Sequence, residues 1–140
     1  MTLRQASTEF RIQTRPHSFT DITDDVAVWV AAQGMQAGLL TLFVRHSTAS
    51  LIVQENADPD VLRDLMDAYR RLAPADAGWR HDTEGPDDMP GHVKAALSPT
   101  SLSVPVVNGR MALGTWQAIY LAEWRAAPHT RALAAHLVGD

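Results

Sequence analysis

The N-terminal part of the chain changes from one hydrophobic period to another. Apolar and polar residues alternate over residues 3–14, which predicts a half-buried strand. After a turn at residues 15–18, apolar residues recur at helical spacing, and this predicts a helix over about residues 21–33. Thr20 or Asp21 is suited to cap this helix.

The next segment contains a second strand pair and a second helix. A nearly continuous apolar run at residues 39–44 predicts a strand that is buried on both faces, and residues 51–53 predict another strand. Asp58 followed by Pro59 is typical of a helix start, and Pro74 ends this helix. Its predicted buried stripe is Val61, Leu62, Leu65, Met66, Tyr69 and Leu72.

The C-terminal third is mostly β-prone. A short helix is predicted from Met89 or Pro90 to Leu97, followed by an edge strand at residues 102–106 that tolerates a proline. Asn108-Gly109 predicts a hairpin turn. The return strand begins at residues 110–113, bulges at Gly114-Thr115 and continues through residues 116–124. The pattern of the tail, residues 130–138, is compatible with a strand or a helix.

Composition narrows the class of protein. A chain of 140 residues predicts a single domain, residues 1–140. The net charge of -4 and the lack of a Lys/Arg run argue against nucleic acid as a partner. The absence of cysteine excludes thiol catalysis and thiolate metal sites. No apolar run is long enough to span a membrane, and residues 1–10 do not resemble a signal peptide, so we expect a soluble cytoplasmic protein.

The segment from Trp79 to Leu97 has the strongest chemical character. His81 and His92 bracket four carboxylates, with glycines and prolines between them. Long loops inside compact domains are usually functional or disordered, and the apolar anchors of this loop argue against disorder. Solvated histidines are the alternative interpretation of the pair. Because neutral imidazole is a common metal ligand, two histidines and a third from elsewhere predict an open metal site.

Further candidates lie at the ends of predicted strands and helices. His46 ends a buried strand, and we hypothesise that it converges with His81 and His92 on one pocket. A satisfied surface histidine is the alternative for His46, and a helix cap alone is the alternative for Asp58. Asp87 and Asp88 can hold a hard cation such as Mg²⁺, or form a solvated turn.

Other residues are suited to an anionic or aromatic ligand. Lys94 and Arg110 are candidate phosphate partners, although each is also consistent with an ordinary surface charge. Trp116 is a candidate stacking surface or a core residue. No P-loop, dinucleotide-binding glycine motif or serine nucleophile elbow is present.

Four segments together resemble the YjbQ family, whose members are commonly described as secondary thiamine-phosphate synthases. They are His46-Ser47-Thr48-Ala49-Ser50-Leu51, Glu55-Asn56-Ala57-Asp58-Pro59-Asp60-Val61, residues 81–97 and Gly109-Arg110 through Gly114-Thr115-Trp116-Gln117 to Glu123. The resemblance covers residues 3–138 in order. It implies an α+β domain with a β-sheet core, two main helices and one short helix, a strand for the tail, and assembly as a homotrimer with the pocket near a subunit boundary.

The resemblance also implies roles for particular residues. As catalytic residues it points to His46, His81, Glu84, His92 and Glu123. As substrate-binding residues it points to Asn56, Asp58, Lys94, Trp116 and Gln117, to which we add Arg110 from its charge; the candidate metal ligands are His46, His81 and His92. Ser47, Ala118 and Trp124 stand where relatives often have Thr, Gly and His. The change at Trp124 argues against any mechanism that needs a base at that position beside Glu123.

Three functions stay open on the sequence. The first is a transferase that acts on phosphorylated small molecules, as in thiamine phosphate synthesis. Such a reaction must stabilise the charge of a pyrophosphate leaving group and position two substrates. The second is a metabolite- or anion-binding module without turnover, and the third is a histidine-metal hydrolase. A divalent metal, Zn²⁺ or Mg²⁺, is the only cofactor that the residues indicate.

Overall fold

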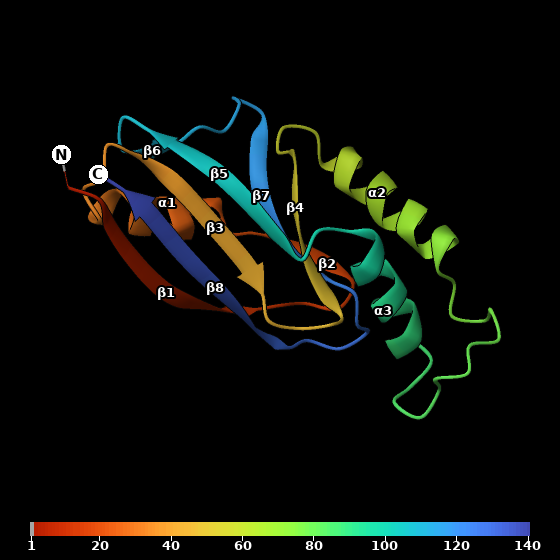
Figure 1. Ribbon diagram of the computed structural model, residues 1–140. Helices are drawn as coiled ribbons and strands as arrows, with labels where there is room; N and C mark the ends of the chain where they lie inside the picture. The colour runs from red at the N-terminus through yellow and green to blue at the C-terminus, as the bar shows by residue number, and fades with distance from the viewer. Residues whose placement is uncertain (1) are drawn as a thin grey trace.

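The computed structural model describes residues 2–140 and contains two antiparallel β-sheets with three helices (Figure 1). The larger sheet has five strands in the order β1-β8-β3-β5-β6, and the smaller has three in the order β2-β7-β4. The strands are β1 (Arg4–Gln13), β2 (Ser18–Asp21), β3 (Ala37–Val44), β4 (Ala49–Glu55), β5 (Ser101–Val107), β6 (Arg110–Met111), β7 (Gln117–Glu123) and β8 (Thr130–Gly139). The helices are α1 (Thr23–Ala32), α2 (Pro59–Leu72) and α3 (Asp88–Leu97). No helix within residues 2–140 has the length and apolar character that a membrane crossing requires.

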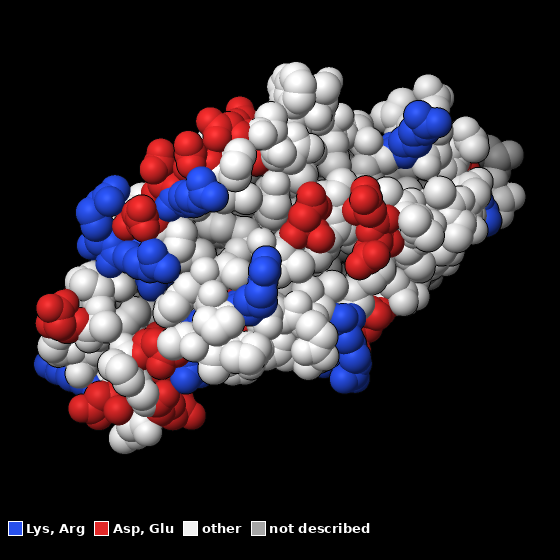
Figure 2. Space-filling view, turned by 180° about the vertical axis from the view of Figure 1, so that it is seen from behind, with Lys and Arg blue, Asp and Glu red and all other residues white. Residues whose placement is uncertain are grey.

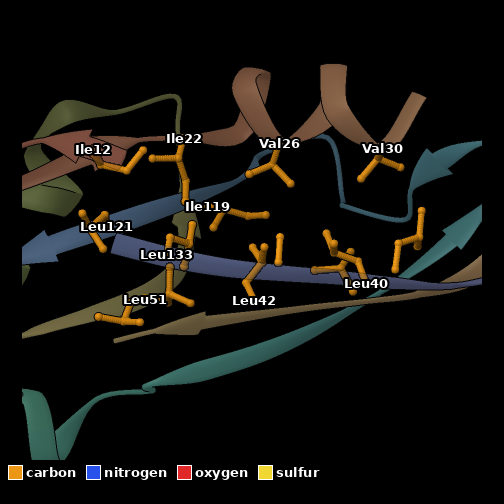
Figure 3. Packing of buried hydrophobic residues seen from close by; sticks show 14 of the residues in the cluster. Ile12, Ile22, Val26, Val30, Leu40, Leu42, Leu51, Ile119, Leu121 and Leu133 are labelled. Carbon is orange, nitrogen blue, oxygen red and sulfur yellow. The ribbon is translucent and has the colours of Figure 1, made fainter. Parts of the chain in front are cut away.

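The main core lies between the two sheets and the inner face of α1. Val26 and Val30 of α1 point toward Leu40 and Leu42 of β3 and Ile119 of β7 (Figure 3). A second, smaller apolar cluster lies on the other side of the three-stranded sheet. There Met66 of α2 and Ala95 of α3 pack with Ala122 and Trp124. Strand β7 is therefore covered on both faces, and α2 and α3 are held together at one end of the molecule (Figure 1).

Most predicted elements are confirmed, including the hairpin between β5 and β6. Asn108 and Gly109 have φ angles of 52° and 75°, as a two-residue turn of the primed type requires. The tail is strand β8, which pairs with β1 and β3. Asp58 is the N-cap of α2, and its Oδ1 accepts a hydrogen bond from the Asp60 amide at 2.9 Å.

Several sequence predictions were wrong in detail. The short strand β2 precedes α1, so the cap position falls on Ile22 rather than on Thr20 or Asp21. Asp21 still accepts a hydrogen bond from the Thr23 amide. Strand β6 has only two residues, because the chain leaves the larger sheet at that point to reach the smaller one. Gly114-Thr115 is therefore not a bulge within one return strand but part of the connection between β6 and β7.

Burial was also predicted incorrectly at two places. Strand β3 is not buried on both faces, since Leu39 and Phe43 are 43% and 48% exposed while the alternate residues are fully buried. The apolar run hides the period of two because both faces carry apolar side chains. In α2 only Met66 is fully buried, and Leu72 is 64% exposed.

Candidate metal centre and a buried ion pair

Helix α3 positions two of the candidate ligands. Asp88 is its first residue and His92 lies four residues later, so both side chains lie on one face of the helix. The Oδ2 atom of Asp88 is 3.3 Å from Nε2 of His92. Pro90 falls in the first helical turn, where its missing N–H costs no hydrogen bond. The sequence prediction began this helix one or two residues too late, and it therefore treated Asp88 as a loop residue.

The loop before α3 supplies the third ligand. Trp79 anchors this loop by donating a hydrogen bond from Nε1 to the Pro74 carbonyl at 2.8 Å. Gly85 has a φ of 98°, a backbone conformation that favours glycine, and it turns the chain toward α3. His81 is thereby placed with its Nε2 atom 2.6 Å from Oδ2 of Asp88.

The α3 cluster, defined as His81, Asp88 and His92, has the donor set of a divalent metal site. One ligand atom from each residue lies within 4.8 Å of the other two. In a tetrahedral zinc site, ligand atoms at Zn–N and Zn–O distances of about 2.0–2.2 Å lie roughly 3.3–3.5 Å apart. The His92–Asp88 separation of 3.3 Å already fits, and the His81–Asp88 distance of 2.6 Å would have to lengthen by roughly 0.7 Å. Two histidines and one carboxylate leave coordination positions open.

Arg125 orients the carboxylate of Asp88 by contacting the oxygen that the two histidines do not contact. Its Nη1 is 2.9 Å from Oδ1 of Asp88, and its Nε donates to Oδ2 of Asp87 at 2.8 Å. Glu84 completes the surroundings, with its Oε2 3.3 Å from His81 Nε2. Asp88 is 2% exposed, whereas the His81 side chain is 41% exposed, so the cluster is built on a buried anion and opens to solvent.

The charges of the cluster stabilise one another. The hydrogen bond to Asp88 raises the pKa of His81. Burial opposes ionisation of Asp88, but its hydrogen bonds and Arg125 outweigh that effect and lower the pKa of Asp88. An ionised carboxylate beside two imidazoles is a good ligand set above the His81 pKa and a proton-binding site below it.

Glu123, a predicted catalytic residue, lies in a second charged group, which is buried and has its hydrogen bonds satisfied within the protein. We define the Glu123 cluster as Glu123, Arg131, Thr14 and Thr48. Arg131 binds both carboxylate oxygens of Glu123, and Thr14 Oγ1 donates to Oε1 at 2.7 Å. Burial opposes ionisation, but the hydrogen bonds from Arg131 and Thr14 prevail and hold the pKa of Glu123 below its usual range. Glu123 is fully buried.

His46 lies near the Glu123 cluster and not among the ligand atoms of the α3 cluster. Its Nε2 accepts a hydrogen bond from the Ala132 amide at 2.7 Å, and burial lowers its pKa. Among residues 2–140 the convergence of ligand atoms is limited to His81, Asp88 and His92. To bind a metal through Nε2, His46 would have to give up this backbone hydrogen bond. The hypothesis of three convergent histidines is thus supported for two of them.

Four more of the predicted site residues, Asn56, Asp58, Trp116 and Gln117, lie at the opposite end of the smaller sheet. In the β4–β7 pair, Ala49 is opposite Glu123 and Glu55 is opposite Gln117. Asn56 donates its backbone N–H to the Trp116 carbonyl, so the Asn56–Asp58 segment adjoins Trp116 and Gln117. Trp116 is 64% exposed. Within one chain these four residues form a group apart from the α3 cluster.

The two predicted phosphate partners lie elsewhere. Arg110 is exposed on the two-residue strand β6 of the larger sheet, and Lys94 is buried on α3.

Trp124 is part of the second apolar cluster rather than of a reactive site. It is fully buried, and its Nε1 donates to Ser50 Oγ at 2.8 Å. Its ring packs against Phe19 and Tyr69 at centroid distances of 5.8 and 4.7 Å. Sequence reasoning missed His17 and Arg131. It considered Asp88 as a ligand of a hard cation together with Asp87, but it did not group Asp88 with the two histidines. Only the Asp88–His92 spacing of four carried a signal that was readable in advance.

The family assignment follows from comparison with known proteins. Residues 8–140 match the family described as UPF0047 protein YjbQ-like. A UPF0047 protein from Synechocystis is 46% identical over 140 residues, covering 99% of this chain and 95% of the relative. The YjbQ protein of Escherichia coli O157:H7 is 38% identical over 130 residues, covering 92% and 94%. This chain belongs to the YjbQ/UPF0047 family.

Solved structures of relatives have the same fold. A YjbQ/UPF0047 family protein from Clostridium acetobutylicum, described as uncharacterised, has a TM-score of 0.84 at 34% identity and covers 91% of this chain and 97% of its own. A protein of unknown function from Sulfolobus solfataricus P2 has a TM-score of 0.91 at 23% identity and covers 99% and 100%. The α+β fold expected from the resemblance is thus confirmed.

Proposed function

We propose that this YjbQ-family protein is a metal-dependent enzyme that acts on small phosphorylated molecules at the α3 cluster. The observation that carries the proposal is the approach of His81, Asp88 and His92 ligand atoms to within 4.8 Å, with Asp88 held by Arg125. A bound divalent ion supplies a Lewis acid that neutralises charge on a substrate oxygen. Mg²⁺ prefers an all-oxygen ligand set, so two imidazoles favour Zn²⁺ or a similar ion.

The residues of the α3 cluster and its surroundings have different proposed roles. The two imidazoles and Asp88 hold the ion, and Arg125 keeps Asp88 ionised and oriented. Glu84 is exposed and lies 3.3 Å from His81, so it is placed to accept a proton from water or from a substrate group. Glu123 has no free oxygen for this work, because Arg131 and Thr14 saturate it. We therefore propose that Glu123 supports the fold and that Glu84 is the acid-base residue.

The reaction is tested directly by its products. Purified protein is incubated with a pyrimidine diphosphate and a thiazole phosphate, with and without added Zn²⁺. Thiamine phosphate with pyrophosphate indicates the transferase that the family resemblance implies, and hydrolysis products alone indicate a hydrolase. We expect turnover to require the metal, to be lost in Asp88→Asn and to persist in the exposed control Asp76→Asn. Saturable binding without turnover in any condition would instead favour a binding module.

We also propose a homotrimer, which the family resemblance implies and an exposed apolar surface supports. Val104 and Val106 of β5 face the core. On the outer face of the larger sheet, Leu39 and Phe43 of β3 and Val107 of β5 are exposed on one side. Exposed apolar patches of this kind often mark contacts between chains. Light scattering that gives the monomer mass at micromolar concentration would reject the trimer.

A further inference from the structure

Two adjoining cavities lie between α2, α3 and the turn before β2. The first, the Lys94 cavity, has a volume of about 310 Å³ and is lined by His17, Arg70, Lys94, Asp87 and a wall of alanine and proline. The second, the α2 groove, has about 400 Å³ and shares His17 and Arg70 with the first. Figure 2 shows basic side chains among acidic ones at the end of the molecule that carries α2 and α3.

Lys94 is an unusual residue to find inside a protein without a partner. It is 3% exposed, although lysine is almost never fully buried unless it is paired. No carboxylate among residues 2–140 forms an ion pair with it. An anion in the cavity would supply the missing charge.

His17 is a second polar residue at the cavity whose hydrogen-bonding capacity is not used within the protein. Its Nδ1 is the one buried side-chain nitrogen or oxygen of residues 2–140 that has no hydrogen-bond partner. Its backbone has a φ of 43°, which non-glycine residues rarely adopt, and its N–H donates to the Arg125 carbonyl. The backbone at His17 is thus held in place, and the residue lines both cavities. Buried polar atoms without partners in a native structure call for an explanation such as a bound ion.

Within residues 2–140, Asp87 is the one acidic residue that lines the Lys94 cavity, and it already has hydrogen-bond partners. Oδ2 of Asp87 accepts hydrogen bonds from Arg125 Nε and the Ala126 amide, both at 2.8 Å. Arg70 donates a hydrogen bond from Nη1 to Asp67 Oδ1 at 3.0 Å, and the other N–H groups of its guanidinium remain available. The fully buried Glu123 acts on His17 only through its distant charge. The free hydrogen-bonding capacity of the cavity is thus mainly that of donors.

We propose that the Lys94 cavity binds the phosphoryl group of a small phosphorylated molecule, with Lys94 and Arg70 as cationic partners and His17 as a ring donor. The rest of the ligand lies in the α2 groove, where Phe19, Leu62 and Met66 offer apolar surface. A lysine ammonium and an arginine fork are the usual protein partners of phosphate.

This site is distinct from the α3 cluster. Lys94 follows His92 by two residues on α3, and two residues correspond to about 200° around a helix. Lys94 and the ligands His92 and Asp88 therefore lie on opposite faces of the same helix. The phosphate site does not depend on a metal, and its failure would leave the proposed metal centre untouched.

The test is a calorimetric titration with inorganic phosphate and with phenyl phosphate, in a buffer that contains a chelator. We expect one saturable site per chain, with phenyl phosphate binding more tightly because its ring enters the α2 groove. Arg70→Gln should weaken phosphate binding by about tenfold or more, the loss of one charge-assisted hydrogen bond. Its neighbour Arg71→Gln is the matched control, since Arg71 is exposed and lines neither cavity.

A second variant and a spectroscopic signal separate a built site from general charge attraction. Lys94→Met removes the charge while it keeps most of the length of the side chain, and it should also abolish binding. The NMR signals of His17 should shift with the same affinity as the calorimetric curve. Equal losses in Arg70→Gln and Arg71→Gln, an unshifted His17, or binding that the chelator removes would each overturn the proposal.

Discussion

Arg125 joins two groups of charged residues that differ in how completely their hydrogen bonds are used. Its backbone N–H donates to Glu123 at 3.1 Å, and its side chain holds Asp87 and Asp88. In the Glu123 cluster, the carboxylate is fully buried and receives bonds from Arg131, Thr14 and Arg125. In the α3 cluster, the carboxylate is equally buried, but its imidazole partners reach solvent.

The difference separates a structural group from a reactive one. A buried carboxylate with every lone pair satisfied has no capacity left to bind anything else. A buried carboxylate that faces two half-exposed imidazoles can exchange its hydrogen bonds for a metal ion. Charge and burial alone therefore do not identify a reactive site. What identifies it is that the groups bonded to the carboxylate are exposed and can still bind a ligand.

The largest expected effect comes from breaking the buried pair. Arg131→Met leaves Glu123 buried without its main partner, and we expect a loss of about 3–5 kcal/mol in unfolding free energy. Urea denaturation followed by circular dichroism measures this. The exposed pair Arg63–Asp60 is the control, and Arg63→Met should cost less than about 1 kcal/mol. Similar losses in the two variants would contradict the structural role of the Glu123 cluster.

Changes in the α3 cluster should act on metal affinity rather than on folding. We expect His92→Asn to weaken Zn²⁺ binding by at least about 10–100-fold, a range known for residues that only support a ligand. His46→Asn should leave the affinity unchanged, because His46 Nε2 is bonded to the Ala132 amide. Competition with a chromogenic chelator measures both. A matching loss in His46→Asn would restore the third histidine to the ligand set.

Asp58→Ala tests the far end of the smaller sheet. The structure makes Asp58 the N-cap of α2, so its removal should cost about 0.5–2 kcal/mol, and Asp58→Asn should retain most of the stability. Thermal unfolding gives the difference. We expect no change in Zn²⁺ affinity for either variant, since Asp58 lies away from the α3 cluster. Loss of ligand binding at an unchanged melting temperature would give Asp58 a role in the site instead.

The smallest effect is the opposite pH dependence of the two clusters in metal-free protein. The lowered pKa of Glu123 means that its stabilisation is present above about pH 4.3, its unfolded value, and is lost as pH falls through the folded value. The raised pKa of His81 means that its stabilisation is present below about pH 6.5 and is lost as pH rises through the folded value. Unfolding free energies measured between pH 3 and 8 should show a smaller acid slope in Glu123→Gln, with the part that comes from the lowered pKa of Asp88 retained. His81→Asn should lose the neutral slope and, because His81 no longer bonds Asp88, part of the acid slope as well. A neutral slope that changed in Glu123→Gln, or one that persisted in His81→Asn, would contradict the assignment.

Local sequence patterns predicted most helices, strands and turns well, because the signal for each of them lies within the element itself. The Asp58-Pro59 start, the Asn108-Gly109 turn and the alternation of β1 depend on neighbouring residues only. Burial was harder, because Leu39 and Phe43 are exposed by their position in the sheet and not by their own sequence. Strand β2 was missed because four residues are too few to show a period.

The candidate site was predicted in part for the same reason. His81 and His92 were recognised because a constrained loop and a short helix connect them along the chain. The ligand role of Asp88 depends on where α3 begins, a boundary that the sequence placed slightly too late. The separation of His46 from the cluster and the pairing of Glu123 with Arg131 depend on strand order and register, which local patterns do not carry.

The most direct test of the metal centre is anomalous diffraction at the zinc edge from crystals grown with Zn²⁺. The account predicts one strong peak in each chain, within about 2.0–2.2 Å of His81 Nε2, His92 Nε2 and Asp88 Oδ2. Asp88→Asn crystals prepared in the same way should show that peak weakened or absent. A peak at His46 or His129 with the α3 cluster empty, or no peak under saturating Zn²⁺, would contradict it.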